Sequence, residues 1–276
     1  MKKILRFLKY EEPYIYKRGD TSVSCTRYII ESMSPTLNSL YQKVKGRARV
    51  AGINKIINID KANVSKAMKV HEGQPALLDR KDGNNNIVIG FMPEIINEWI
   101  YAHELIHYLN PEVEKVLQPT LSVSHTEINI EILNEIARGL FGVIVDHFIN
   151  RLVLQAEIDI AIFIEFHTKV GELHPGNPLQ RTYFVKNLLA TLLMEKFIGV
   201  KDRHYQQFIG AKRTIENKYP QLIPLLLKFI DVINSIGNFE FKDIQTLYEA
   251  VLFQEEIING LYQFAVNTES PRIIVK

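Results

Sequence analysis

Apolar residues occur in short runs in the first half of the chain and at helical spacing in the second half. Residues 75–79 and 87–91 form two short apolar runs, and the segment between them is rich in Asp, Asn and Gly, which favour turns. We therefore predict a β-hairpin that ends in Ile87-Val88-Ile89-Gly90-Phe91 and leads directly into a helix.

That next helix has recognisable start and stop signals. Met92-Pro93-Glu94 precedes it, with proline at the expected first helical position. Asn110-Pro111 closes it, because proline cannot continue a helix. Apolar residues lie on all sides of the segment, so we expect the helix to be largely buried. They are Ile96, Trp99, Ile100, Leu105, Ile106 and Leu109.

The pattern after this helix predicts a mainly helical segment to about residue 265. A long helix is expected from about residue 127 to 167, and a loop rich in Gly and Pro follows it. The tail from residue 267 is expected to be frayed, with residues 273–275 as a candidate edge strand. Further helices are predicted over residues 179–197, 204–218, 221–236 and 241–264.

These elements predict an α+β protein that is predominantly α-helical. Residues 1–70 form a mixed N-terminal region. Residues 71–170 form a core with a small sheet or hairpin beside the helix that follows it, and residues 171–276 form a C-terminal helical region.

A basic run, Lys43-Val44-Lys45-Gly46-Arg47-Ala48-Arg49, alternates cations with small or apolar residues. In an extended strand the four cations would share one face, where they could contact phosphates or an acidic partner. A solvated edge strand, whose charges prevent aggregation, is the favoured interpretation. The chain as a whole is not basic, so we do not expect a nucleic-acid partner.

Composition adds few restrictions. The chain has 276 residues, 46% hydrophobic and 23% charged, with a formal net charge of +2, as in ordinary globular proteins. Cys25 is the only cysteine, which excludes an intrachain disulfide and suits a reducing compartment. The N-terminus lacks the apolar stretch of a signal peptide, and no run approaches the ~18 apolar residues of a membrane span. We expect a soluble, cytoplasmic protein without a membrane partner.

The candidate chemistry lies in the predicted buried helix, in the segment His103-Glu104-Leu105-Ile106-His107. Histidines four residues apart share one helical face, about 6 Å apart along the axis, so two imidazoles can hold one Zn²⁺. Chance alone would give this pattern in roughly 0.02 of such chains. Buried histidines and a buried carboxylate need partners, and a metal would satisfy all three.

A catalytic zinc takes three protein ligands, so a third must come from elsewhere in the chain. The long predicted helix carries a stripe of small and polar residues on an otherwise apolar surface. Two glycines on one helical face suggest close approach of another element, which we expect to be the helix that carries the two histidines. The stripe consists of Glu135, Gly139, Gly142, Asp146 and Asn150.

Asp146 is the predicted third ligand, because a carboxylate in an apolar run is costly unless it is paired or bound to metal. Glu135 is the rival, and Glu131 is a weaker alternative. Glu135 and Asp146 lie about 16 Å apart along the helix, so they cannot bind the same ion. Without metal, an ion pair with Arg138 or Arg151 would explain Asp146, and a solvated pair with Arg138 would explain Glu135.

The segment from Trp99 to Asn110 resembles the active-site helix of the zincin metallopeptidases, which carry the motif HExxH. Asp146-His147-Phe148-Ile149-Asn150 is similar to an aspartate–asparagine signature that follows HExxH in some microbial metallopeptidase domains. No Gly-x-x-His extension follows His107, so the metzincin branch does not fit. The resemblance is therefore to an uncharacterised gluzincin-like or aspzincin-like subfamily, and it implies a zincin-like catalytic core.

This resemblance implies one Zn²⁺ per chain, held by His103 and His107, with Glu104 as the general base that takes a proton from the attacking water. The substrate would be a peptide or a protein. The oxyanion of the reaction would need a further donor. The candidates are Tyr108, His167, His174 and Tyr183.

Two alternative functions remain open from the sequence. HExxH also serves amide hydrolases that are not peptidases, so a small amide could be the substrate. The chain could also be a regulatory or nucleic-acid-binding module on a zincin scaffold that uses the basic run. An intact Glu104 favours an active enzyme over such a module.

Overall fold

The computed structural model describes residues 5–68, 76–115, 128–161, 163, 176–197, 205–236, 240–252 and 254–266. The chain divides into two compact units. The first holds Met1–Pro111 with Ile149–Ile162, and the second holds Glu112–Phe148 with Phe163–Lys276. This grouping differs from the predicted boundary at residue 70, because strands from both sides of that residue share one sheet.

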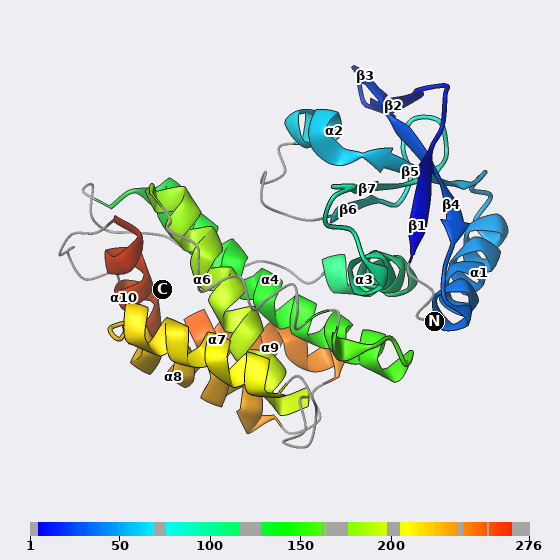
Figure 1. Cartoon of the computed structure of the whole chain (residues 1–276). Coiled ribbons are helices and arrows are strands. Elements are labelled where there is room, and N and C mark those ends of the chain that lie inside the picture. The colour runs from blue at the N-terminus through cyan, green and yellow to red at the C-terminus, as the bar shows by residue number, and fades with distance from the viewer. Residues whose placement is uncertain are drawn as a thin grey trace. The chain divides into compact units, whose positions relative to one another are not determined.

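The first unit contains a five-stranded mixed sheet in the order β1-β4-β5-β7-β6 (Figure 1). Among the described strands of this sheet, only β5 and β7 pair in parallel, and the other neighbours are antiparallel. A separate hairpin, β2–β3, completes the described strands. The strands are β1 (Arg6–Lys9), β2 (Tyr14–Arg18), β3 (Thr21–Cys25), β4 (Arg27–Ser32), β5 (Ile56–Asp60), β6 (Ala76–Asp79) and β7 (Ile87–Phe91).

The predicted hairpin before the histidine helix is confirmed. β6 and β7 pair antiparallel, with Ala76 opposite Phe91 and Asp79 opposite Val88. All five residues of β7 are buried, as expected for a central strand with an unbroken apolar sequence. A side chain of the β2–β3 hairpin contacts the β6–β7 hairpin. The Tyr16 hydroxyl of β2 donates a 2.7 Å hydrogen bond to the Asp79 carboxylate of β6.

The helix that carries the two histidines, α3 (Glu98–Leu109), begins later than predicted. Residues 93–95 form a turn, so the expected helix start at Pro93 is wrong. The start is set by Asn97, whose side-chain oxygen accepts a hydrogen bond from the backbone N–H of Ile100. The expected end at Asn110 and the expected burial of the helix are both confirmed.

Helix α3 packs against β6 and against helix α1 (Pro35–Val50) within the first unit (Figure 1). The Tyr101 hydroxyl donates a 2.8 Å hydrogen bond to Asn58 of β5, and the Tyr101 ring contacts Phe7 of β1 edge-on. Burial raises the pKa of Tyr101 well above its ordinary value, so this hydroxyl stays protonated and continues to donate.

The basic run lies in helix α1, so its prediction as an extended strand is wrong. Val44 and Ala48, four residues apart, are buried on one side of the helix, and the intervening cations are exposed. The apolar and small residues that alternate with the cations would share one face of a strand, but Val44 and Ala48 also share one face of this helix. Arg47 donates a hydrogen bond to the carbonyl of Leu109, the last residue of α3.

Arg80 stabilises the C-terminal turn of α3 more directly. Its guanidinium donates to the carbonyl oxygens of both Tyr108, at 2.8 Å, and His107. These carbonyls lie at the negative end of the helix dipole, which favours a cation. We expect Arg80→Ala to lower the free energy of unfolding by roughly 1.5–3 kcal/mol, measured by urea denaturation. Arg47→Ala, which removes an exposed contact at the same helix end, should cost less, and the reverse order would contradict this assignment.

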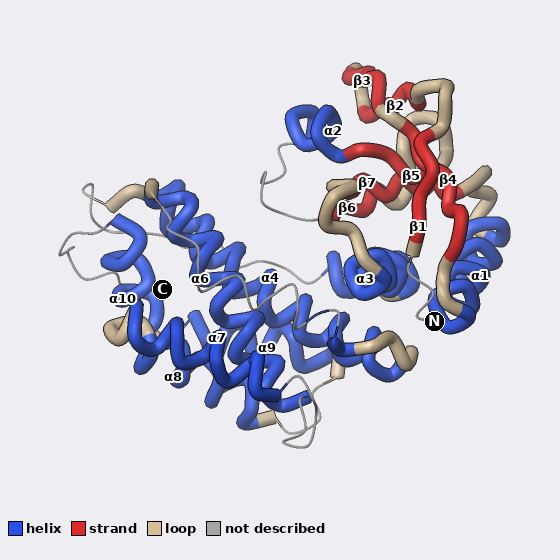
Figure 2. Tube along the Cα trace, viewed as in Figure 1, coloured by secondary structure: helices blue, strands red, loops and turns tan. Residues whose placement is uncertain are grey.

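The described part of the second unit is helical, and the strands, red in Figure 2, belong to the first unit. Its short 3₁₀ segments are η1 (Pro111–Lys115, whose first residue belongs to the first unit), η3 (Met194–Phe197) and η4 (Phe241–Asp243). Its helices are α4 (Ile130–Gln155, whose last seven residues belong to the first unit), α6 (Pro178–Leu193), α7 (Tyr205–Lys218), α8 (Ile223–Ser235), α9 (Ile244–Leu252) and α10 (Glu255–Val266).

Most predicted helices of this region are confirmed, with two differences. The long helix α4 ends at Gln155, and Glu157 adopts a positive φ of 60° just beyond it, which is incompatible with a continuing helix. The segment predicted as one helix over 241–264 is divided into α9 and α10. The predicted strand at 273–275 lies outside the described residues. Of the helices that the structure describes, none is both long and apolar enough to cross a bilayer.

Candidate metal centre

The two histidines of α3 point the same nitrogen toward one another. The Nε2 atoms of His103 and His107 lie 3.1 Å apart. Two imidazole nitrogens bound to one tetrahedral zinc, each at about 2.0–2.1 Å, would be about 3.4 Å apart. The observed separation is therefore close to the one that a shared ion requires.

Asn150 of α4 determines which nitrogen of His103 carries the proton. Its side-chain oxygen accepts a 3.1 Å hydrogen bond from Trp99 Nε1, which can only donate. The same oxygen lies 3.0 Å from His103 Nδ1. An amide oxygen cannot donate, so His103 Nδ1 must carry the hydrogen, and the Nε2 of a neutral ring keeps its lone pair for a metal.

Asp146 lies one helical turn before Asn150 in the continuous helix α4. Asn150 is held beside α3 by its two hydrogen bonds, so helix geometry carries the Asp146 carboxylate toward the histidines. The ligand atoms of His103, His107 and Asp146 all lie within 4.8 Å of one another. All three residues are half-buried.

Among the described residues, the two rival carboxylates, Glu135 and Glu131, are not part of this cluster. Glu135 forms an ion pair with Arg138, three residues along the same helix, as expected for a carboxylate without a metal role. Glu131 is exposed in the first turn of α4. Asp146 pairs with Lys186 of α6 at 3.1 Å, a partner that the sequence did not indicate.

The glycines of the α4 stripe have a different neighbour from the one expected. A Cβ at Gly142 would lie 3.1 Å from Lys186 Nζ, and a Cβ at Gly139 would lie 4.0 Å from Lys186 Cβ. The prediction that these glycines admit α3 is wrong, because the side chain that passes over them comes from α6.

Glu104 directly follows His103 and is 7% exposed. A buried carboxylate is suited to proton transfer, because little water competes for it.

Among the candidate oxyanion donors, Tyr108 is buried. The central carbon of the Arg80 guanidinium lies over the Tyr108 ring, 5.7 Å from the ring centroid. His167 and His174 lie outside the described residues.

Of the candidate donors that the structure describes, Tyr183 of α6 has an electrostatic link to Asp146. Burial raises the pKa of its hydroxyl, and the negative charge of Asp146 raises it further, against the lowering effect of Lys186. The hydroxyl is therefore protonated at neutral pH and able to donate a hydrogen bond.

The donor set fits zinc. Two imidazoles and one carboxylate, with a fourth position left for water, are a usual arrangement of a catalytic zinc. A second feature supports the fit, because ligating histidines commonly donate their other N–H to a carbonyl or carboxylate oxygen, as His103 does to Asn150. Sequence reasoning placed Asn150 on the correct face but gave it no role. Its spacing of four residues from Asp146 was the available signal.

Replacing Asn150 tests this arrangement. Asn150→Ala removes the acceptor that fixes the His103 ring, so we expect zinc to bind about 10- to 100-fold more weakly. Asn150→Asp keeps an acceptor at the same place and should retain the affinity. A competition titration with a chromophoric chelator measures both. Equal affinities for the wild type and Asn150→Ala would exclude the role.

Comparisons of the chain with protein-family models, with curated proteins and with solved structures gave no match.

Proposed function

We propose that this chain is a zinc-dependent metallopeptidase. The observation that carries the proposal is the convergence of His103 Nε2, His107 Nε2 and the Asp146 carboxylate, with Asn150 setting the tautomer of His103. When bound there, the metal would polarise the scissile carbonyl and increase the acidity of water.

The protein residues then have distinct roles. His103, His107 and Asp146 hold the ion, and Glu104 takes a proton from the attacking water and delivers it to the leaving amine. Tyr183, with its protonated hydroxyl, is the favoured donor to the developing oxyanion. These assignments agree with the zincin resemblance of the α3 segment.

A sheet edge favours a peptide over a small amide as the substrate. β6 is the last strand of the five-stranded sheet, and among the described strands it pairs only with β7. Helix α3 packs against β6, so an extended chain that paired with β6 would run beside the helix that carries the histidines. Backbone pairing of this kind recognises peptides but offers little to a small amide.

The nucleic-acid-binding alternative loses its main support. It required four cations on one face of a strand, and the run lies in α1 instead. Arg47 also contacts the end of α3, which gives this residue a structural role.

Digestion of a mixed peptide library by the zinc-loaded protein, followed by mass spectrometry, tests the proposal. We expect new peptide ends that disappear with a chelator and return when zinc is added back. If protein with one bound zinc cleaves no peptide but hydrolyses small amides, the amide-hydrolase alternative is correct.

A further inference from the structure

The Asp146 carboxylate has a cation beside it from another helix. Lys186 Nζ of α6 lies 3.1 Å from Asp146 Oδ2, and both side chains are only about one quarter exposed, at 28% and 26%. A pair at this depth is less screened by water than a surface ion pair. Lys186 therefore neutralises much of the charge that Asp146 would offer to a metal.

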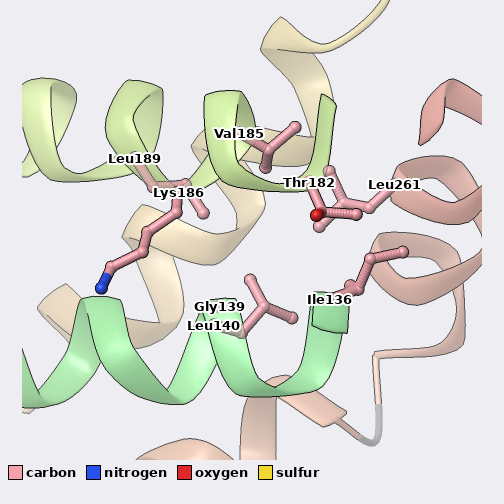
Figure 3. A pocket seen from close by; sticks show the side chains of 8 residues that line it. All are labelled: Ile136, Gly139, Leu140, Thr182, Val185, Lys186, Leu189 and Leu261. Carbon is pink, nitrogen blue, oxygen red and sulfur yellow. The ribbon is translucent and has the colours of Figure 1, made fainter. Parts of the chain in front are cut away.

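The glycine stripe of α4 makes this contact possible. Figure 3 shows Lys186 extending from α6 to α4, where it lines a small pocket together with residues of α4, α6 and α10. A side chain at position 142 would crowd the ammonium, with Cβ 3.1 Å from Nζ and 3.4 Å from Cε. Glycine costs about 1 kcal/mol in a helix interior relative to alanine. The space that Gly142 leaves for the Lys186 side chain offsets this cost.

We propose that Lys186 is the built-in counter-ion of Asp146 and competes with the metal for this carboxylate. The inference rests on the metal site proposed above and concerns its regulation. A divalent ion and an ammonium on one carboxylate repel each other, and this repulsion opposes metal binding. Lys186 therefore weakens metal binding and makes loading of the site depend on the supply of zinc.

Zinc affinity, measured by competition with a chromophoric chelator, tests the proposal without a substrate. Lys186→Met keeps the length and the apolar stem but removes the charge, and we expect zinc to bind about tenfold more tightly. Lys186→Arg keeps the charge and should bind zinc as the wild type does.

A second pair of variants tests the same contact from the α4 side. Gly142→Ala would push the flexible end of Lys186 away, so zinc should bind about two- to threefold more tightly. Gly139→Ala makes only an ordinary contact with Lys186, so the affinity should be unchanged. Both substitutions improve helix propensity, so a difference between them cannot come from lost folding.

The outcomes separate this inference from the proposed function. Equal affinity in all five proteins would overturn the competition and leave the metal site intact. Weaker binding by Lys186→Met would also overturn it, because Lys186 would then hold Asp146 in place for the metal. If the wild type and every variant fail to bind zinc, the proposed metal site fails and the inference fails with it.

Discussion

Replacing Glu104 with glutamine is expected to lower peptide hydrolysis by about 10²- to 10⁴-fold, which is the usual contribution of a general acid–base. Glutamine has nearly the same shape but cannot accept the proton of the attacking water. Glu104 is not one of the three clustered ligands, so the variant should still bind one zinc. Steady-state cleavage of a peptide found in the library digestion, with metal content measured on the same sample, gives both values.

Glu98→Gln is a matched control on the same helix. Glu98 accepts a 2.8 Å hydrogen bond from the Ser34 backbone, and a glutamine oxygen can accept the same bond. This variant should retain wild-type activity and zinc. Activity in Glu104→Gln within about threefold of the wild type would rule out the general-base role, since such a role is worth far more.

Removal of the Asp146 carboxylate should have the largest effect on metal binding among changes in α4. Asp146→Ala leaves two imidazoles, and we expect the affinity for zinc to fall by more than about 100-fold, because even outer-shell partners are worth about 10- to 100-fold. A titration of metal-free protein against a chelator of known affinity measures the change.

Glu135→Ala distinguishes the two carboxylates that the sequence offered. Glu135 pairs with Arg138 in the same helix, so this variant should bind zinc as the wild type does. If Glu135→Ala lost zinc and Asp146→Ala kept it, the ligand assignment would be reversed.

The hairpin and the end of α3 were predictable because their signals are local. Turn residues separate two apolar runs, and proline at 111 cannot continue the helix that precedes it. The start of α3 was harder, because Pro93 and Asn97 are both recognised start signals and only the capping hydrogen bond distinguishes them.

The site was predictable as far as spacing allows. Spacing of four residues placed His103 and His107 together, and the α4 stripe placed Asp146 and Asn150 on one face. Spacing identifies a face of a helix but not the element that packs against it. Lys186 is forty residues away in sequence from Asp146, so no local pattern could reveal the ion pair or the true neighbour of the glycines.

The most direct test of the metal site is zinc-edge X-ray absorption of the zinc-loaded wild-type protein, combined with elemental analysis. We expect one zinc per chain, bound by two imidazole nitrogens and by oxygen at about 2.0–2.2 Å. A protein that holds no zinc after reconstitution, or a spectrum without imidazole scattering, would contradict the assignment of His103, His107 and Asp146 as the metal ligands.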